Sequence, residues 1–324
     1  MSTMNAIQVP APGEPMELVQ IPVPTPEVDQ VLIRVEACGV CYGESKIIEG
    51  WASSYPRIPG HEVVGVIEKL GTGAGKWKVG QRVGIGWDGG HSCGHHQTTA
   101  LTMNGGYAEY MVANADALIL IPDELSSEQA APILCAGETV FSALRNSVAR
   151  AGDVVAVSGI GGLGHLAIQY AKKIGLYVVA ISSSKDKENL ARELGAHQFI
   201  DASTEDVAAK LKELGGAKVI VATAPDGKTI SGLIGGLGTD AELIIAAVSS
   251  DDLGLTAMDF LKGPNTIRGT FTGKTKELEA ALRFSVLADV RPLIEVFPLE
   301  RAKEAYDKMM AAKTRFRAVI SMSA

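Results

Sequence analysis

The chain has 324 residues and a formal net charge of −7, with 46% hydrophobic and 21% charged residues. This length accommodates two domains or one large one, and the composition is that of an ordinary soluble globular protein. The negative charge disfavours nucleic acid and anionic membrane surfaces as partners. No apolar run approaches the roughly 20 residues needed to span a bilayer, and residues 1–15 show no secretory signal pattern. We therefore expect a cytoplasmic protein with no membrane partner.

The first third of the chain is predicted to consist mainly of β-strands and turns. Six prolines between positions 10 and 26 exclude a helix there. Strands are expected over 31–37, 63–70, 81–85 and 106–112. Short strands separated by turn residues predict a barrel-like β domain.

From about residue 126 onward, strands and helices alternate. Apolar strands are expected over 154–157, 177–181, 218–222 and 243–248. Helices are expected near 139–149, 163–174, 186–194 and 204–214. This alternation predicts a doubly wound parallel sheet.

The end of the chain reads as two helices followed by a strand, near 275–287, 300–312 and 317–322. Such a tail needs a sheet to join, so we expect it to return to the first domain. The predicted domains are therefore 1–136, with 273–324 returning to it, and 137–272.

A glycine-rich turn follows the strand at 154–157 and precedes a helical pattern. This order places backbone N–H groups at a helix start, where a pyrophosphate binds. Gly159 permits the tight turn, Gly161 lets the backbone approach the phosphates, and Gly164 allows the helix to pack on the strand. The candidate cofactor residues of this turn are Gly159, Gly161, Gly162, Leu163 and Gly164. A plain strand–helix turn without a ligand is the alternative.

The residues after the next strand bear on the choice of nicotinamide cofactor. An NAD site usually has an acidic residue about 20 residues past the glycine turn, and this chain has Ser182 there. Ser183, Ser184 and Lys187 follow, and hydroxyl groups with lysines suit the 2′-phosphate of NADP. We predict NADP, contacted by Ser183 and Lys187, with NAD as the alternative. A helix-capping role for Ser183 or Ser184 is the other interpretation.

Cysteines occur at positions 38, 41, 93 and 135, which are too few and too scattered for a disulfide framework. Cys41 follows a predicted strand, His61 and Glu62 lie in a turn, and Cys135 precedes a predicted helix. Thiolate, imidazole and carboxylate groups together suit Zn²⁺. Each residue alone also has a structural interpretation, since a lone buried cysteine commonly serves as a small core residue.

Motifs along the whole chain resemble those of the zinc-dependent medium-chain alcohol dehydrogenases. The motifs are Cys38-Gly39-Val40-Cys41, Pro59 to Gly65, Gly105 to Tyr110, Leu134 to Thr139, the glycine turn and Arg315-Phe316-Arg317. The serine run resembles the NADP-using cinnamyl alcohol dehydrogenase branch. The family implies a GroES-like β-barrel catalytic domain and a Rossmann domain with a doubly wound parallel sheet.

The resemblance implies that Cys41, His61 and Cys135 bind one catalytic zinc, with Glu62 as an alternate ligand that exchanges with water or substrate. Zinc lowers the pKa of a bound alcohol and polarises a carbonyl. The implied reaction moves a hydride between a small-molecule alcohol, aldehyde or ketone and NADP(H) or NAD(H).

The family likeness also places Thr139 near the nicotinamide and Arg317 near the pyrophosphate. It implies a homodimer or homotetramer. Segments 243–248 and 266–273 are the candidates for a sheet that continues across the interface.

The chain departs from the family pattern along the proton path. Many members have a Ser or Thr two residues after the first ligand, where this chain has Gly43. Where a relay histidine can follow, it has Ser45 and Lys46. We hypothesise that water, helped by Tyr42 or Lys46, moves the proton.

A second departure is the absence of the four-cysteine lobe that holds a structural zinc in many relatives. Segment 87–104 is shorter and retains only Cys93. A structural zinc takes four closed ligands, and His91, Cys93, His95 and His96 would be cramped within six residues. We therefore expect a shortened polar loop and a single, catalytic zinc.

Two other functions stay open at this point. A zinc-free quinone or enone reductase of the same superfamily would generally lack the set formed by Cys41, His61 and Cys135. A non-catalytic nucleotide-binding or structural protein is compatible with Gly43 and the missing lobe, but the ligand set argues against it.

Overall fold

The computed structural model describes residues 2–261 and 265–323. The chain divides into two compact units, the first comprising Met1–Glu138 with Thr272–Ala324 and the second comprising Thr139–Phe271. Among the described residues, no helix is both long enough and apolar enough to cross a membrane. Each unit is described by itself below.

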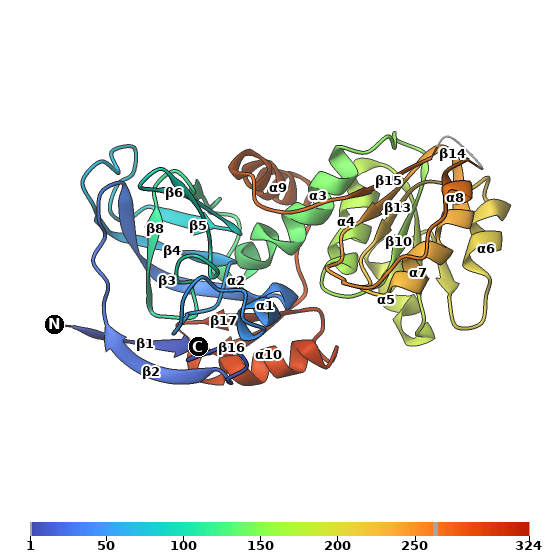
Figure 1. Cartoon of the computed structure of the whole chain (residues 1–324). Helices are drawn as coiled ribbons and strands as arrows, with labels where there is room; N and C mark the ends of the chain where they lie inside the picture. Colours follow the sequence, from blue (N-terminus) through green and yellow to red (C-terminus); the bar gives the residue numbers. More distant parts are fainter. Residues whose placement is uncertain (1, 262–264, 324) are drawn as a thin grey trace. The chain divides into compact units, whose positions relative to one another are not determined.

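The first unit contains a seven-stranded sheet (Figure 1). Along the sheet its strands are β16 (Ile294–Pro298), β17 (Arg317–Ser321), β3 (Gln30–Val40), β4 (Val63–Leu70), β5 (Arg82–Ile85) and β9 (Ile119–Leu120), while β8 (Tyr110–Asn114) pairs with β3. All pairs are antiparallel except β16 with β17. The inward side chains of β3 and β4, such as Ile33 and Ile67, are fully buried in one core. Most positions of β3 and of the first half of β4 are buried.

Two small hairpins and several short helices complete this unit. The hairpins are β1 (Thr3–Gln8) with β2 (Glu17–Pro22), and β6 (Asp88–Ser92) with β7 (His95–Thr98). The helices are η1 (Tyr42–Glu44), α1 (Ser45–Ile48), α2 (Ser127–Ala130), η2 (Ala131–Leu134), α9 (Thr275–Ala288), η5 (Leu299–Arg301) and α10 (Ala302–Met310). Helix α3 (Ala136–Arg145) begins in the first unit and ends in the second.

The last strand of the chain belongs to the same sheet as the first long strand. β17 runs antiparallel to β3, with Ala318 opposite Val40 and Ser321 opposite Ala37. The pairing supplies the backbone partners that a tail of two helices and one strand lacks on its own.

The second unit is a six-stranded parallel sheet with helices on its two sides, α4 and α6 among them (Figure 1). Its strand order is β12 (Gln198–Asp201), β11 (Tyr177–Ser182), β10 (Val154–Ser158), β13 (Ala217–Ala222), β14 (Leu237–Ile245) and β15 (Thr266–Gly269). The helices are α4 (Gly164–Ile174), η3 (Lys185–Lys187), α5 (Glu188–Glu193), α6 (Val207–Glu213), α7 (Gly227–Gly232), η4 (Ile234–Gly236) and α8 (Ala257–Leu261).

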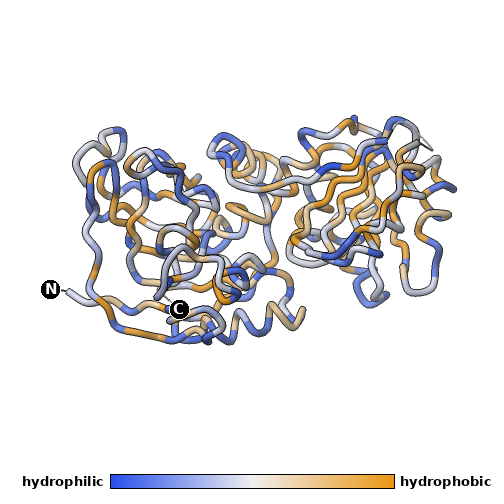
Figure 2. Tube along the Cα trace, in the orientation of Figure 1, coloured by the Kyte–Doolittle hydropathy of each residue, from blue (hydrophilic) through white to orange (hydrophobic). Residues whose placement is uncertain are grey.

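This arrangement confirms the predicted doubly wound parallel sheet. Apolar residues run continuously through the strands (Figure 2), as expected where helices cover both faces. The strand order reverses between β10 and β13, and ligands bind in the crevice outside the carboxyl ends of the strands at such a switch point.

Three expectations about individual segments were wrong. Segment 87–104 contains the β6–β7 hairpin rather than only a polar loop. The strand expected over 106–112 begins at Tyr110, because the N–H groups of Gly106 and Tyr107 donate to the carbonyls of Gly60 and Pro59. The strand expected over 243–248 ends at Ile245 and has a neighbouring strand on each side, so it offers no free edge to a second chain.

Candidate functional site

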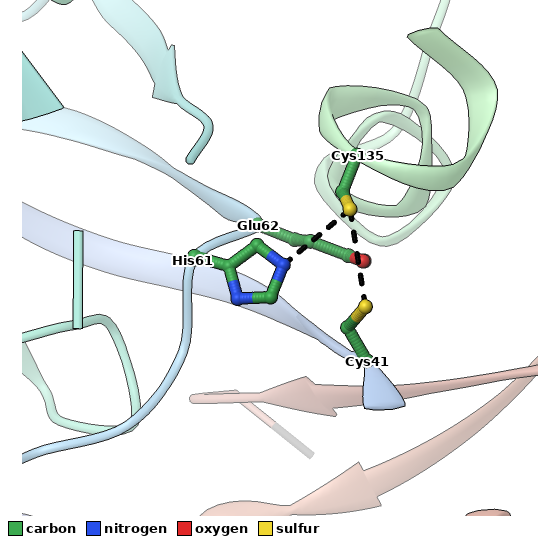
Figure 3. Close-up of side chains that lie close together, drawn as sticks. All are labelled: Cys41, His61, Glu62 and Cys135. Atoms are coloured by element: carbon green, nitrogen blue, oxygen red, sulfur yellow. Dashed lines mark hydrogen bonds between the residues drawn. The ribbon is translucent and has the colours of Figure 1, made fainter. Parts of the chain in front are cut away.

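Four predicted ligands converge in the first unit (Figure 3). Cys41 directly follows β3, His61 and Glu62 lie in the turn before β4, and Cys135 follows η2. All four are buried, and one donor atom from each lies within 4.8 Å of the others. Within residues 2–261 and 265–323, this is the one group of three or more such side chains able to hold a metal ion.

The two thiols and the imidazole are in direct contact. Cys41 Sγ lies 3.8 Å from Cys135 Sγ, and His61 Nε2 lies 3.4 Å from the same Cys135 sulfur. The hydrogen bond from Cys135 lowers the pKa of Cys41, and the same bond together with burial raises the pKa of Cys135. A cation between the two sulfurs would favour deprotonation of both thiols, since metal ligands bind as thiolates.

Glu44 orients His61, a role that the sequence analysis did not assign. It is fully buried, its Oε1 lies 2.7 Å from His61 Nδ1, and its carboxylate accepts the backbone N–H groups of Gly60 and His61. Burial acts to lower the pKa of His61, but Glu44 and Cys41 outweigh it and raise that pKa above its ordinary value. The contact leaves Nε2 facing the sulfurs, as carboxylates that contact the other ring nitrogen do for metal-binding histidines. The available signal was an acidic residue three positions after Cys41.

Glu62 is paired with Arg317, which lies on β17. The two side chains are buried and hydrogen-bonded to each other. Burial raises the pKa of Glu62 to about 7, although Arg317 acts to lower it. Gly39 makes this arrangement sterically feasible, because a Cβ there would overlap the Glu62 carboxylate. The predicted contact of Arg317 with a pyrophosphate stays a prediction.

The residues predicted for the proton path lie outside the metal group. Lys46 pairs with Glu49 at 2.7 Å and lies over the rings of Tyr42 and Trp51. Gly43 borders the site, since a Cβ there would lie 3.0 Å from His61 Cε1 and 3.4 Å from the Trp87 ring. Trp87 in turn packs edge-on against the His61 ring, at 4.8 Å between centroids.

The second unit contains a cavity of about 660 Å³ at the carboxyl ends of β10, β11 and β13. Every residue of the predicted glycine turn except Gly164 lines it, as do Ser182, Ser183 and Lys187. Ser184 does not line it, and its side chain makes no cap hydrogen bond at η3. Lys187 Nζ donates to the Ile160 carbonyl at 3.0 Å, so this lysine bridges the serine loop and the glycine turn.

The glycine turn has the geometry expected of a close-packed strand–helix turn. Gly159 has φ +92° and a Cβ there would lie 2.8 Å from Thr223 Oγ1. A Cβ on Gly164 would overlap the Gly159 carbonyl oxygen, whereas one on Gly161 would meet nothing within 4 Å. Thr223, which sequence reasoning missed, has its Oγ1 2.9 Å from the carbonyl oxygens of Ser158 and of Gly159, which share its single hydroxyl proton. The open space over Gly161 is what a phosphate needs to approach the backbone.

Thr139 lies on α3, four residues after Cys135, and is buried. Its predicted place near a nicotinamide stays a prediction.

Comparison with known proteins identifies the family. Residues 27–123 match the alcohol dehydrogenase GroES-like domain, and residues 162–286 match the zinc-binding dehydrogenase domain. Alcohol dehydrogenase notN from Aspergillus sp. (strain MF297-2) is 41% identical, with 96% of this chain and 95% of that protein covered. The chain belongs to the zinc-dependent medium-chain alcohol dehydrogenases.

Further relatives of this alcohol dehydrogenase agree in sequence and in fold. An alcohol dehydrogenase from Geobacillus stearothermophilus is 36% identical over 98% of this chain and 100% of its own length. The structure of a cinnamyl alcohol dehydrogenase from Sorghum bicolor superposes with a TM-score of 0.89 at 28% identity, covering 100% and 98% of the two chains. The expected GroES-like and Rossmann folds and an alcohol dehydrogenase activity are thereby confirmed.

Proposed function

We propose that Cys41, His61 and Cys135 bind one catalytic zinc ion, with Glu62 as an exchangeable fourth ligand. The observation that carries this proposal is the buried set of two sulfurs, one imidazole nitrogen and one carboxylate. Zn–S bonds of about 2.3 Å and Zn–N bonds of about 2.0 Å at a tetrahedral angle separate two sulfurs by about 3.8 Å, and nitrogen from sulfur by about 3.5 Å. The separations of 3.8 and 3.4 Å between these atoms support this fit.

A zinc ion in this group would act as a Lewis acid toward an alcohol or carbonyl oxygen of a small-molecule substrate. The chain's own residues prepare the site for it. Glu44 holds the His61 ring with Nε2 toward the sulfurs, and Arg317 holds the Glu62 carboxylate beside them. Trp87 packs against the His61 ring, nearly perpendicular to it.

For the cofactor we propose NADP in preference to NAD. Ser182, Ser183 and Lys187 line the cavity at the end of β11, where an NAD site would carry an acidic residue. Hydroxyl groups and a lysine favour a 2′-phosphate through charge-assisted hydrogen bonds. Thr139 is proposed to lie near the nicotinamide, and Arg317 near the pyrophosphate in the same complex.

The zinc proposal is tested by metal analysis of the purified enzyme, with one zinc per chain expected. Incubation with a strong chelator should abolish alcohol oxidation, and added Zn²⁺ should restore it. Full activity of a metal-free preparation would contradict the proposal.

The cofactor proposal is tested by kcat/KM for NADP⁺ and NAD⁺. We expect a clear preference for NADP⁺, and Lys187→Gln should lower kcat/KM for NADP⁺ about tenfold while changing that for NAD⁺ little. Lys185→Gln is the matched control, because Lys185 lies in the same loop but does not line the cavity. Equal kcat/KM values for the two cofactors would overturn the preference.

We also propose a route for the proton and an oligomeric state. Water, helped by Tyr42 or Lys46, would carry the proton that Gly43 cannot relay, and an unchanged pH–rate profile in Tyr42→Phe and Lys46→Met would exclude this. A homodimer or homotetramer is proposed from the edge strand β15. Light scattering of the purified protein measures the number of chains.

A further inference from the structure

We propose that His91 and His96 form a second, exposed binding site for a divalent ion of the nickel, copper and zinc class. The site lies on the β6–β7 hairpin, apart from the buried group at Cys41. In the register of this hairpin His91 is directly opposite His96. Directly opposed residues of antiparallel strands project from the same face, with their Cβ atoms about 5 Å apart.

The two rings have a separation that suits a shared ion. Their centroids are 5.6 Å apart and their planes are inclined by 73°. A metal bound at about 2.0–2.1 Å from a ring nitrogen lies about 3.2 Å from that ring's centroid. Angles between 90° and 109.5° at the ion, which cover square-planar and tetrahedral coordination, separate the two centroids by about 4.5 to 5.2 Å. The observed spacing lies just above this range, so the two exposed side chains turn toward each other to share an ion while the hairpin keeps its register.

Each histidine is oriented by its own carboxylate. His91 Nδ1 lies 2.9 Å from Asp116 Oδ2, and His96 Nε2 lies 3.0 Å from Asp88 Oδ1. An ionised carboxylate only accepts hydrogen bonds, so the ring nitrogen that faces it carries the proton. This leaves Nε2 of His91 and Nδ1 of His96 as lone-pair donors. A carboxylate behind a histidine raises its basicity and fixes its tautomer in metal sites.

The backbone holds the hairpin in place beneath the two rings. The His91 N–H donates to both Asp116 oxygens, and the Asn114 amide donates to the Gly89 carbonyl at 2.7 Å. The turn residues Cys93 and Gly94 have φ +50° and +79°, the positive pair that a two-residue hairpin turn requires. The pair of rings is therefore carried by a defined hairpin.

The site differs in kind from the buried zinc group. The side chains of His91 and His96 are 61% and 55% exposed, so an ion there keeps water in its open positions and exchanges freely. Imidazole ligands suit nickel, copper and zinc. The other described histidines do not offer this pair, because His61 and His165 are buried and both ring nitrogens of His197 are hydrogen-bonded.

His95 supplies a matched control within the same hairpin. It is exposed, lies next to His96 on β7 and is opposite Ser92 rather than another histidine. Successive residues of a strand point to opposite faces, so His95 projects away from the His91–His96 pair.

The test is calorimetric titration of the zinc-loaded enzyme with NiCl₂, with zinc content measured before and after. We expect one Ni²⁺ per chain to bind without zinc release. His91→Gln and His96→Gln should each weaken this binding at least about tenfold, as should Asp116→Asn through loss of orientation, and His95→Gln should leave it unchanged.

Either of two results would overturn the proposal. Equal weakening in His95→Gln would show that Ni²⁺ binds surface histidines without using the pair. Absence of Ni²⁺ binding, or binding only as zinc is released, would show that the hairpin holds no site. The thermal unfolding temperature of each variant verifies that the fold is retained.

Discussion

At the scale of single residues, the buried ion pair of Glu62 and Arg317 places two opposite charges out of water beside the metal group. Both side chains are within 4% of complete burial, and their pairing offsets the cost of burying two charges. Gly39 leaves room for the Glu62 carboxylate, and Arg317 arrives from the opposite end of the chain.

Arg317→Met should lower the free energy of unfolding by about 3 kcal/mol, because it leaves the Glu62 carboxylate buried without a partner. The double variant Glu62→Gln with Arg317→Met should recover a large part of this loss, since no charge is then left unpaired. Urea denaturation of the metal-free proteins measures both changes. Equal stability of the single and double variants would contradict the coupling.

Gly43 is a second position where the lack of a side chain affects packing and stability. Gly43→Ser should destabilise the protein by about 1–3 kcal/mol through overpacking, because its Cβ would lie 3.0 Å from His61 Cε1 and 3.4 Å from the Trp87 ring. Gly75→Ser is the control, as a Cβ there meets nothing within 4 Å. Thermal unfolding reports the effect.

At the scale of elements, two glycines of the turn from β10 to α4 have different roles. Gly164 affects the stability of the fold, and Gly161 affects cofactor binding. Gly164→Ala should cost about 2 kcal/mol of stability, since its Cβ would overlap the Gly159 carbonyl oxygen. Gly161→Ala should leave the thermal unfolding temperature unchanged, because open space surrounds it.

The same Gly161→Ala variant should raise the KM for the dinucleotide, because the added methyl group keeps the phosphates from the backbone. Steady-state kinetics and calorimetry together measure the two variants. Similar unfolding temperatures for Gly164→Ala and the unmodified chain would show that the turn tolerates a side chain there.

The β6–β7 hairpin lies in the segment where many relatives have the longer four-cysteine lobe. Its strands are short and polar, with Asp88, His91 and His96 partly exposed. Polar composition alone predicts a loop, whereas the positive φ angles at Cys93 and Gly94 allow a two-residue turn that brings the strands into register.

At the scale of the whole molecule, the two candidate sites belong to different compact units. The four metal ligands come from the first unit, and the cavity at the glycine turn is formed by the second. Each unit has a buried core of its own. A ligand stabilises the unit that binds it in the folded state only.

Removal of zinc should therefore lower the unfolding temperature of the first unit, and NADPH should raise that of the second. At a concentration 100 times its Kd, the dinucleotide should add about 2.7 kcal/mol. Differential scanning calorimetry with chelator, with NADPH and with both measures these shifts. A single transition that moves equally under both treatments would show that the units unfold together.

The amino-acid sequence was enough to predict the doubly wound sheet and the glycine turn, and its resemblance to a known family supplied the candidate metal ligands. These features rest on local patterns: apolar strands alternating with helices, glycines between a strand and a helix, and short motifs around Cys41 and His61. Such patterns depend on neighbouring residues, so they can be read without knowing how distant segments meet.

Which side chains face one another could be seen only in the folded chain. Glu62 and Arg317 are 255 positions apart, and His91 and Asp116 are 25 positions apart. The partner of a buried carboxylate or an exposed histidine depends on sheet order and strand register. Burial then determines how strongly the loss of a partner destabilises the protein, because a charge that is buried and left unpaired raises the free energy of the folded state.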